Sequence, residues 1–327
     1  MSRNGCNAVT SHRSATLFKS TSGRTCVAST RRGASIATAT GKAKKAPQTV
    51  ARRSSADRGP RKVPAQLALD RVGSGPPLIL LHGLGSNRRV WDPIVPALSR
   101  HFKVVAIDLP GFGESPMPDD GDVSIEAQAR AVERTMKRLR IPRAHFVGNS
   151  MGGRLALELA RRRKALSVVA ISPHGAFNQS EGRWERFTIR LQRRAARLIA
   201  PLGTLPFRTR FGRRAALGLV SAKPDLVPPE LAAEATASFA RCSGFDSACQ
   251  SITSANAAGL NKITCPVLIL WGTRDRLLSP AQGPRMARRI KNAKLRKLDR
   301  LGHVPMGEDP GLVSEIILRF TRNVAGV

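Results

Sequence analysis

Short, continuously apolar segments separated by amphipathic stretches run through the chain from residue 64 onward. This alternation restricts the fold more than any other feature of the sequence. The apolar segments lie at residues 78–81, 104–107, 144–148, 166–171 and 267–271. Strands that are apolar on both faces occur in parallel sheets that helices cover on both sides. The sequence therefore predicts an α/β fold with a doubly wound, mostly parallel sheet. None of these segments approaches the roughly 20 apolar residues that a membrane-spanning helix needs.

The stretches between these strands repeat their apolar residues at helical spacing. We expect helices at residues 90–98, 124–139, 151–163 and 281–290. Between about residues 174 and 263 the alternation lapses, and the composition is helical, rich in arginine and interrupted by proline. We expect a helical insertion between two strands there, which would form a lid over a site at the carboxyl ends of the strands.

The chain has many more basic than acidic residues. The 327 residues include 55 Lys and Arg against 22 Asp and Glu, a formal net charge of +33. Residues 1–62 hold 14 of the basic residues and a single acid, Asp57. This segment is rich in Ser, Thr and Ala and has too few apolar residues to bury a core. We expect a disordered basic tail at residues 1–62 and one domain at residues 63–327. An organelle transit peptide, a misplaced start codon and a solvated basic arm are three interpretations of the tail.

The cysteines indicate the redox environment. The chain has five of them, an odd number, with no Cys-x-x-Cys pair. This pattern argues against a disulfide scaffold and against a zinc site, and it is typical of a reducing compartment. We expect free thiols, with a Cys242–Cys249 disulfide as the alternative, and no metal or other cofactor. The expected location is the cytoplasm, or an organelle if the tail is a targeting signal.

A serine motif follows one of the predicted strands. The strand at residues 144–147 runs into Gly-Asn-Ser-Met-Gly-Gly at residues 148–153 and then into a predicted helix. Gly-x-Ser-x-Gly between a strand and a helix is the arrangement of a nucleophilic serine. The glycines allow a tight, strained turn that leaves the Ser150 hydroxyl exposed above the sheet. The N-terminus of the following helix favours negative charge at that position. We therefore expect Ser150 to be a catalytic nucleophile.

A nucleophilic serine needs a base and the base needs a carboxylate. His303 is the last of six histidines and lies next to a glycine, in the loop after a predicted strand at residues 294–298. Asp275 follows the predicted strand at residues 267–270, from where it could reach His303. The order Ser150, Asp275, His303 is the one expected for this geometry on a doubly wound sheet. The alternatives are a surface histidine and an aspartate paired with a neighbouring arginine.

The loop at residues 82–85, His-Gly-Leu-Gly, directly follows the first predicted strand. Its glycines would leave backbone amides free to point into the site. We expect the amides of Leu84 and Met151 to form an oxyanion hole. His82 is expected to hold the shape of this loop rather than to react.

Together these motifs resemble those of the α/β-hydrolases that cleave esters and C–C bonds. The matching segments fall between about residues 67 and 320 and comprise residues 75–77, 82–85, 108–115, 148–153, 272–275 and 302–303. The resemblance implies a cofactor-free Ser-His-Asp hydrolase and gives residues 108–115 a structural role beside the site. Ser150 stands where epoxide hydrolases and haloalkane dehalogenases carry aspartate, which speaks against both.

The leading hypothesis is hydrolysis of a small-molecule carboxylic ester or thioester through an acyl-enzyme intermediate. The alternative is a C–C bond hydrolase of the meta-cleavage-product type with the same triad, although Val304 stands where that branch commonly has tryptophan. A non-catalytic binding protein on the same fold is a remote alternative, because no member of the triad is missing. Nucleic acid is not an expected partner, since the basic residues are spread over the whole chain without a recognition motif. The sequence predicts no particular oligomeric state.

The expected insertion contains a basic segment. Residues 183–214 hold ten arginines and one acid, Glu185. Arg186, Arg190 and Arg193 follow the spacing that places side chains on one face of a helix. Two interpretations are open: a solvated helix face, or a basic lid that meets an anionic membrane surface or an anionic substrate.

Overall fold

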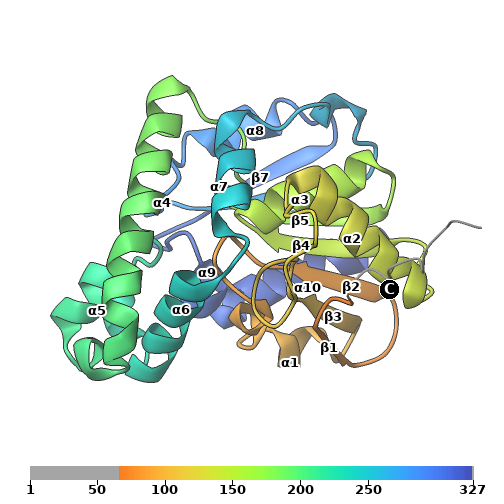
Figure 1. Ribbon diagram of the computed structural model, residues 1–327. Coiled ribbons are helices and arrows are strands. Elements are labelled where there is room, and N and C mark those ends of the chain that lie inside the picture. The colour runs from red at the N-terminus through yellow and green to blue at the C-terminus, as the bar shows by residue number, and fades with distance from the viewer. Residues whose placement is uncertain (1–65, 326–327) are drawn as a thin grey trace, which may run out of the picture. The chain divides into compact units, whose positions relative to one another are not determined.

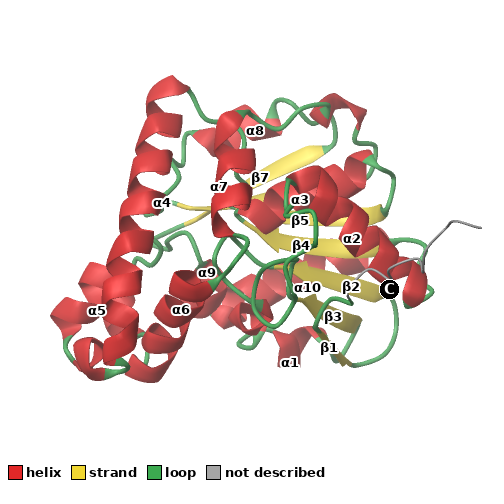
Figure 2. Ribbon diagram, viewed as in Figure 1, coloured by secondary structure: helices red, strands yellow, loops and turns green. Residues whose placement is uncertain are grey.

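A seven-stranded sheet forms the centre of the described chain (Figures 1 and 2). The computed structural model describes residues 66–325, which belong to the second of two units, Met1–Pro60 and Arg61–Val327. The tail expected at residues 1–62 lies outside the described residues. The strand order is β1-β3-β2-β4-β5-β6-β7, with β1 antiparallel to β3 and every other pair parallel. The strands are β1 (Leu69–Val72), β2 (Pro77–Leu81), β3 (Lys103–Ile107), β4 (Ala144–Asn149), β5 (Ala165–Ile171), β6 (Val267–Gly272) and β7 (Ala293–Leu298).

The predicted fold class, a doubly wound and mostly parallel sheet, is confirmed. One of its strands, β1, was not predicted from the apolar pattern. Three of its four residues are exposed, and it pairs with a single neighbour at the edge of the sheet. An exposed edge strand needs no continuous apolar run, because neither of its faces has to be fully covered. The signal that identifies the central strands is therefore absent from β1.

The helix expected at residues 90–98 also differs from the structure. A 3₁₀ helix at Arg88–Trp91 and a single turn of α-helix, α1 (Val95–Leu98), take its place. Pro93 and Pro96 explain the difference, because a proline lacks the amide that a helix interior requires and its ring clashes with the preceding turn. The apolar residues still reach the core, since Trp91 and Leu98 are fully buried.

Helices cover both faces of the sheet (Figure 2). Along β2 the side chains alternate between two cores: Ile79 and Leu81 face one, Leu78 and Leu80 the other. The first core includes residues of α2 (Ile125–Arg138), α3 (Met151–Arg161) and α8 (Gln282–Ala287). The second core includes residues of α1, α9 (Pro305–Glu308) and α10 (Pro310–Ala325). Each fully buried Leu or Ile side chain stabilises the fold by about 1.5–3 kcal/mol.

The chain between β5 and β6 is helical and projects beyond the sheet (Figure 1). Its α-helices are α4 (Gln179–Ile199), α5 (Arg210–Leu217), α6 (Pro229–Arg241) and α7 (Phe245–Ser254). Short 3₁₀ helices lie at Ala200–Leu202, Leu205–Arg208, Pro224–Leu226 and Leu260–Lys262. We call the segment from α4 to α7 the helical insertion. Among residues 66–325, no helix is both long enough and apolar enough to cross a membrane.

A buried arginine, Arg193, connects three helices of the insertion, α4, α6 and α7. Arg193 of α4 donates hydrogen bonds to the carbonyl oxygens of Phe239 and Cys242, at the end of α6. Its guanidinium also lies over the ring of Phe245, 4.3 Å from the ring centroid, at the start of α7. Cys242 and Cys249 are both buried and free, so the alternative disulfide does not form. Packing and buried polar contacts such as those of Arg193, rather than a disulfide, therefore connect α4, α6 and α7.

Three buried histidines have pKa values that burial lowers. His145 lies within β4, is almost fully buried, and has Nδ1 2.8 Å from the Ser167 hydroxyl. Burial lowers its pKa from 6.5 to about 4. Burial also lowers the pKa values of His82 and His174. Between pH 6.5 and about pH 4 the unfolded chain therefore binds more protons at His145 than the folded chain does, and His82 and His174 contribute in the same direction. Acid therefore favours unfolding.

We predict that the free energy of unfolding falls as the pH drops from 6.5 toward 4. For His145 alone the loss is about 1.4 kcal/mol per pH unit. The variant His145→Gln should lose about 2 kcal/mol less than the parent between pH 6.5 and pH 5. Urea denaturation at both pH values measures this difference. A His101→Gln control, at an exposed position, should behave as the parent. Equal losses in the parent and His145→Gln would contradict the prediction.

Candidate active site

Ser150 occupies a sharp turn between β4 and α3. Its φ is +56° and its ψ is −115°, a left-handed conformation that is strained for a residue with a side chain. The turn depends on close backbone contacts, which its glycines permit. A Cβ at Gly152 would lie 2.1 Å from the carbonyl oxygen of Leu81, and one at Gly148 would lie 2.2 Å from the carbonyl oxygen of Gly152. Larger residues at these two positions would force the strand and the helix apart.

The neighbouring residue, Asn149, joins this turn to the loop that carries His303. Its side-chain amide donates to the carbonyl oxygen of His303 at 2.9 Å and faces that of Ile171 at 3.3 Å. Asn149 and Ile171 end adjacent strands, β4 and β5. No role for Asn149 is predicted from the sequence. The sequence feature that could have indicated a role for Asn149 is its place in the motif, one residue before the serine.

The loop after β7 brings His303 to Asp275, which follows β6. His303 Nδ1 lies 2.7 Å from Asp275 Oδ2, and both residues are buried. The other carboxylate oxygen, Oδ1, accepts the backbone amides of Leu277 at 3.0 Å and Leu278 at 2.9 Å. Asp275 is therefore bonded to the histidine and is not a surface partner of the neighbouring arginines. These contacts fix the orientation of the imidazole ring.

The loop at residues 82–85 lies against the serine turn. A Cβ at Gly83 would be 3.3 Å from the Cβ of Ser150. Leu84 is half-buried against the core, and Met151, fully buried, is the first residue of α3. The first amides of a helix have no acceptor within the helix. The structure therefore brings both residues expected to form the oxyanion hole into the immediate neighbourhood of Ser150.

His82 fixes the conformation of this loop. Its Nδ1 lies 2.8 Å from the carbonyl oxygen of Gly83, and its Nε2 accepts the backbone amide of Leu109 at 3.0 Å. The ring also makes an edge contact with Phe112. Burial lowers the pKa of His82, which keeps the imidazole neutral, as these two hydrogen bonds require. This geometry gives His82 a structural position between the loops after β2 and β3.

His174 is a buried histidine to which the sequence analysis gave no role. Its backbone amide donates to the carbonyl oxygen of Ser150 at 3.2 Å. Its Nε2 lies 2.9 Å from Glu185 of α4, which also accepts a hydrogen bond of 2.6 Å from Gln282 of α8. The three side chains link the serine turn to the helical insertion. The sequence feature that could have indicated a role for His174 is its position just beyond a central strand, β5.

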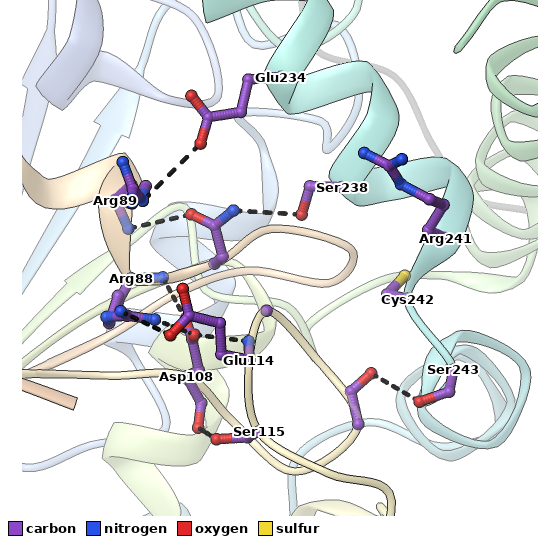
Figure 3. Close-up of a pocket in the computed structure, with 13 residues that line it drawn as sticks. Arg88, Arg89, Asp108, Glu114, Ser115, Glu234, Ser238, Arg241, Cys242 and Ser243 are labelled. Atoms are coloured by element: carbon purple, nitrogen blue, oxygen red, sulfur yellow. Dashed lines mark hydrogen bonds and ion pairs between the residues drawn. The ribbon is translucent and has the colours of Figure 1, made fainter. Parts of the chain in front are cut away.

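A cavity of about 530 Å³ lies between the loops after β2 and β3 and helix α6 (Figure 3). Its lining does not include Ser150, Asp275 or His303. On one wall Arg88 contacts three carboxylates, those of Asp108, Asp70 and Glu114. Asp108 is fully buried and also accepts the backbone amides of Arg88 at 2.6 Å and Glu114 at 2.9 Å. Residues 108–115 thus form a rigid wall, which agrees with the structural role expected for them.

The parallel sheet, the strained serine at a strand-to-helix turn and the buried His–Asp pair on two later loops define the class of α/β-hydrolase-fold proteins. Residues 76–310 match the family model of the alpha/beta hydrolase fold. The chain belongs to this family, and it is a hydrolase. The resemblance stated from the motifs alone is confirmed.

Curated relatives and solved structures agree with this assignment. An uncharacterized protein of Mycobacterium tuberculosis is 29% identical over 262 residues, 76% of each chain. A pimeloyl-[acyl-carrier protein] methyl ester esterase of Neisseria meningitidis is 29% identical over 238 residues, 69% of this chain and 70% of its own. The structure of a bacterial membrane phospholipase A has a TM-score of 0.65 at 27% identity and covers 81% of this chain and 86% of its own. A meta-cleavage product hydrolase of Pseudomonas fluorescens has a TM-score of 0.63 at 26% identity, with coverages of 79% and 94%.

We predict that the wall of the cavity depends on Asp108 and not on Asp70. Asp108→Ala removes a buried acceptor of three N–H groups and should destabilise the protein by about 2–4 kcal/mol. Asp70→Ala removes a carboxylate that also contacts Arg88 but is 55% exposed, and it should cost less than about 1 kcal/mol. Urea denaturation at pH 7 measures both. Equal effects of the two substitutions would contradict this view of the wall.

Proposed function

We propose that the protein is a serine hydrolase that cleaves a carboxylic ester or thioester, with Ser150 as nucleophile, His303 as base and Asp275 as its partner. The observation that carries this proposal is the buried hydrogen bond of 2.7 Å between His303 and Asp275, on a loop that Asn149 binds directly beside the strained serine. A histidine at the surface would need no buried carboxylate. The esterases among the relatives support the same class of reaction.

In the first half of the reaction the Ser150 Oγ attacks the carbonyl carbon of the substrate. His303 Nε2 takes the proton of the hydroxyl, and the resulting imidazolium is stabilised through Nδ1–H by Asp275. The carbonyl oxygen becomes an oxyanion, which accepts hydrogen bonds from the amides of Leu84 and Met151 at the positive end of α3. The C–O or C–S bond then breaks, and His303 returns the proton to the leaving alcohol or thiol.

In the second half water replaces the leaving group. His303 takes a proton from the water as the water oxygen attacks the acyl-enzyme, and the same amides bind the second oxyanion. The collapse of this intermediate returns the proton to Ser150 and releases the carboxylic acid. Neither half of the proposed reaction requires a cofactor.

We propose that the helical insertion is the lid that shapes the substrate site. The backbone amides of His303 and Val304 both donate to the carbonyl oxygen of Val220, at 3.0 and 3.1 Å. On the other side, Gly85 of the 82–85 loop packs against the ring of Phe239. The insertion thus contacts the histidine loop and the expected oxyanion loop together. Its side chains are placed to select the acyl and alcohol groups, because both loops border the reacting carbonyl.

The second candidate is a C–C bond hydrolase of the meta-cleavage-product type, which would use the same three residues. The likeness to the hydrolase of Pseudomonas fluorescens favours it. Val304, in place of the tryptophan common in that branch, argues for the ester hydrolase. A binding protein without activity is disfavoured, because all three side chains of the triad are present and two of them are hydrogen-bonded.

We predict that Ser150→Ala or His303→Ala lowers kcat by about 10⁴- to 10⁶-fold, since triad members act as a unit. Asp275→Asn should lower kcat less, by about 10³- to 10⁴-fold. Asp299→Asn is the matched control, because Asp299 is 83% exposed on the loop after β7, and it should keep the parent activity. Circular dichroism and the unfolding midpoint verify that Ser150→Ala remains folded. Full activity in that variant would exclude the proposed mechanism.

A substrate panel separates the two candidate reactions. It comprises p-nitrophenyl esters and thioesters of graded acyl length and a ring-cleavage diketone. We expect turnover of esters with a dependence on acyl length, because the insertion borders the site, and no turnover of the diketone. Consumption of the diketone without hydrolysis of any ester would establish the C–C hydrolase instead. Each activity is compared with that of Ser150→Ala to exclude a contaminating enzyme.

A further inference from the structure

The outer face of α4 carries an exposed apolar stripe. Trp184, Phe187, Leu191 and Leu198 are between 52% and 79% exposed and follow the spacing i, i+3, i+7 and i+14. We call these four residues the α4 stripe. Nine of the ten large exposed apolar side chains among residues 66–325 lie between residues 184 and 231, and the tenth is Val72 of β1. The exposed apolar surface of the described chain is therefore concentrated on the helical insertion.

The stripe points away from the protein. The buried residues of α4 include Glu185, Ile189 and Arg193, which face the rest of the insertion and the body. At about 100° per residue, the stripe lies about 180° around the helix from this buried face. Figure 1 shows α4 along the margin of the helical insertion, on the side away from the sheet. Within the described chain, the stripe is thus an open surface.

Arginines flank the stripe on one side. The exposed arginines of α4 fall within about 80° of its circumference, between the buried face and the stripe; they are Arg183, Arg186, Arg190, Arg194 and Arg197. No acidic residue occurs from residue 186 to residue 224. The turn after α4 and the start of α5 continue the same composition, with Leu205 and Phe211 exposed beside Arg208 and Arg210. The helix is therefore amphipathic on its solvent side, with apolar side chains next to a purely basic flank.

We propose that the α4 stripe docks the protein onto the surface of an anionic lipid bilayer. Trp, Phe and Leu side chains enter the boundary between headgroups and acyl chains, while adjacent arginines bind the anionic headgroups. Charge complementarity selects this occupant. A second copy of the chain would bring two acid-free basic flanks together, and an anion alone would leave the apolar side chains in water.

The docked face lies close to the catalytic serine, although the proposal does not depend on hydrolysis. Glu185, on the buried face of α4, is bonded to His174, whose amide donates to the carbonyl oxygen of Ser150. The stripe and this network lie on opposite sides of one helix, which is about 10 Å across. Docking through α4 would thus hold the active site beside the lipid surface.

The test uses the full chain and the fluorescence of Trp184. The other two tryptophans, Trp91 and Trp271, are at most 1% exposed, so a shift of emission on binding reports Trp184. With phosphatidylglycerol vesicles we expect cosedimentation and a blue shift of the emission. Pure phosphatidylcholine vesicles should give neither at physiological salt. Binding should weaken steeply from ~0.01 M to ~0.15 M salt, as the screening length falls from about 30 to about 8 Å.

Two sets of variants retain Trp184 and separate the contribution of the apolar side chains to vesicle binding from that of the arginines. Phe187→Ser with Leu191→Ser removes half of the stripe and should weaken vesicle binding by about tenfold or more. Arg190→Gln with Arg194→Gln should weaken binding and reduce its dependence on salt. Val72→Ser is the matched control, since it removes an exposed apolar residue outside the insertion and should bind as the parent does. Unfolding midpoints close to that of the parent confirm that the stripe variants are folded.

Three results would overturn the proposal. Equal vesicle binding by the parent and the Phe187→Ser, Leu191→Ser variant would exclude the stripe as the contact. Cosedimentation without a shift of Trp184 emission would assign binding to another region, such as the basic segment 1–62. Self-association without lipid that the stripe variant abolishes would make a second copy of the chain the occupant. All three readouts are independent of catalysis, so they hold even if Ser150→Ala retains activity.

Discussion

The approach of α3 to β2 at the serine turn is the constraint on which the rest of the site depends. The carbonyl oxygen of Leu81 lies where a side chain at residue 152 would begin, so only glycine permits this contact. The contact holds Ser150 at a φ of +56°, a conformation that the isolated chain would avoid. The 82–85 loop lies against the same serine, since a Cβ at Gly83 would be 3.3 Å from the Cβ of Ser150. Strain at one residue is thus maintained by the packing of a helix and two strands.

Buried polar contacts connect this turn to the histidine loop and to the insertion, and they connect the loops after β2 and β3 to each other. Asn149 binds the histidine loop, His82 joins the loops after β2 and β3, and His174 ties the turn to Glu185 of the insertion. A buried polar group without a partner costs free energy, so each contact specifies one arrangement as well as stabilising it. The low pKa values of His82 and His174 follow from the same burial. The acid sensitivity that we predict for the fold has the same cause, the burial of these imidazoles.

The two faces of the helical insertion differ in what they contact. Its inner face contacts the loops that border Ser150, and α4 reaches the serine turn through a buried carboxylate. Its outer face exposes large apolar side chains beside arginines. Soluble domains bury such side chains unless a surface or a partner covers them. The two proposals therefore concern opposite faces of one insertion, with substrate selection on the inner face and docking at a lipid surface on the outer face.

The sequence by itself determined the central strands, the fold class and the residues Ser150, Asp275 and His303 as site candidates. Continuous apolar runs and glycine-flanked turns are local signals, and they do not depend on what packs against them. β1 was not predicted, because an edge strand needs no apolar run. The long helix predicted at residues 90–98 does not form, because two prolines limit it to a single turn of α-helix. Only the tertiary structure decided that His303 bonds to Asp275, 28 residues away in the chain, and that Asn149 and His174 join the site. It also decided that Trp184, Phe187, Leu191 and Leu198 of α4 face outward while Ile189 of the same helix is buried. A helical period reports which residues share a face, but burial of that face depends on neighbours that lie far apart in the sequence.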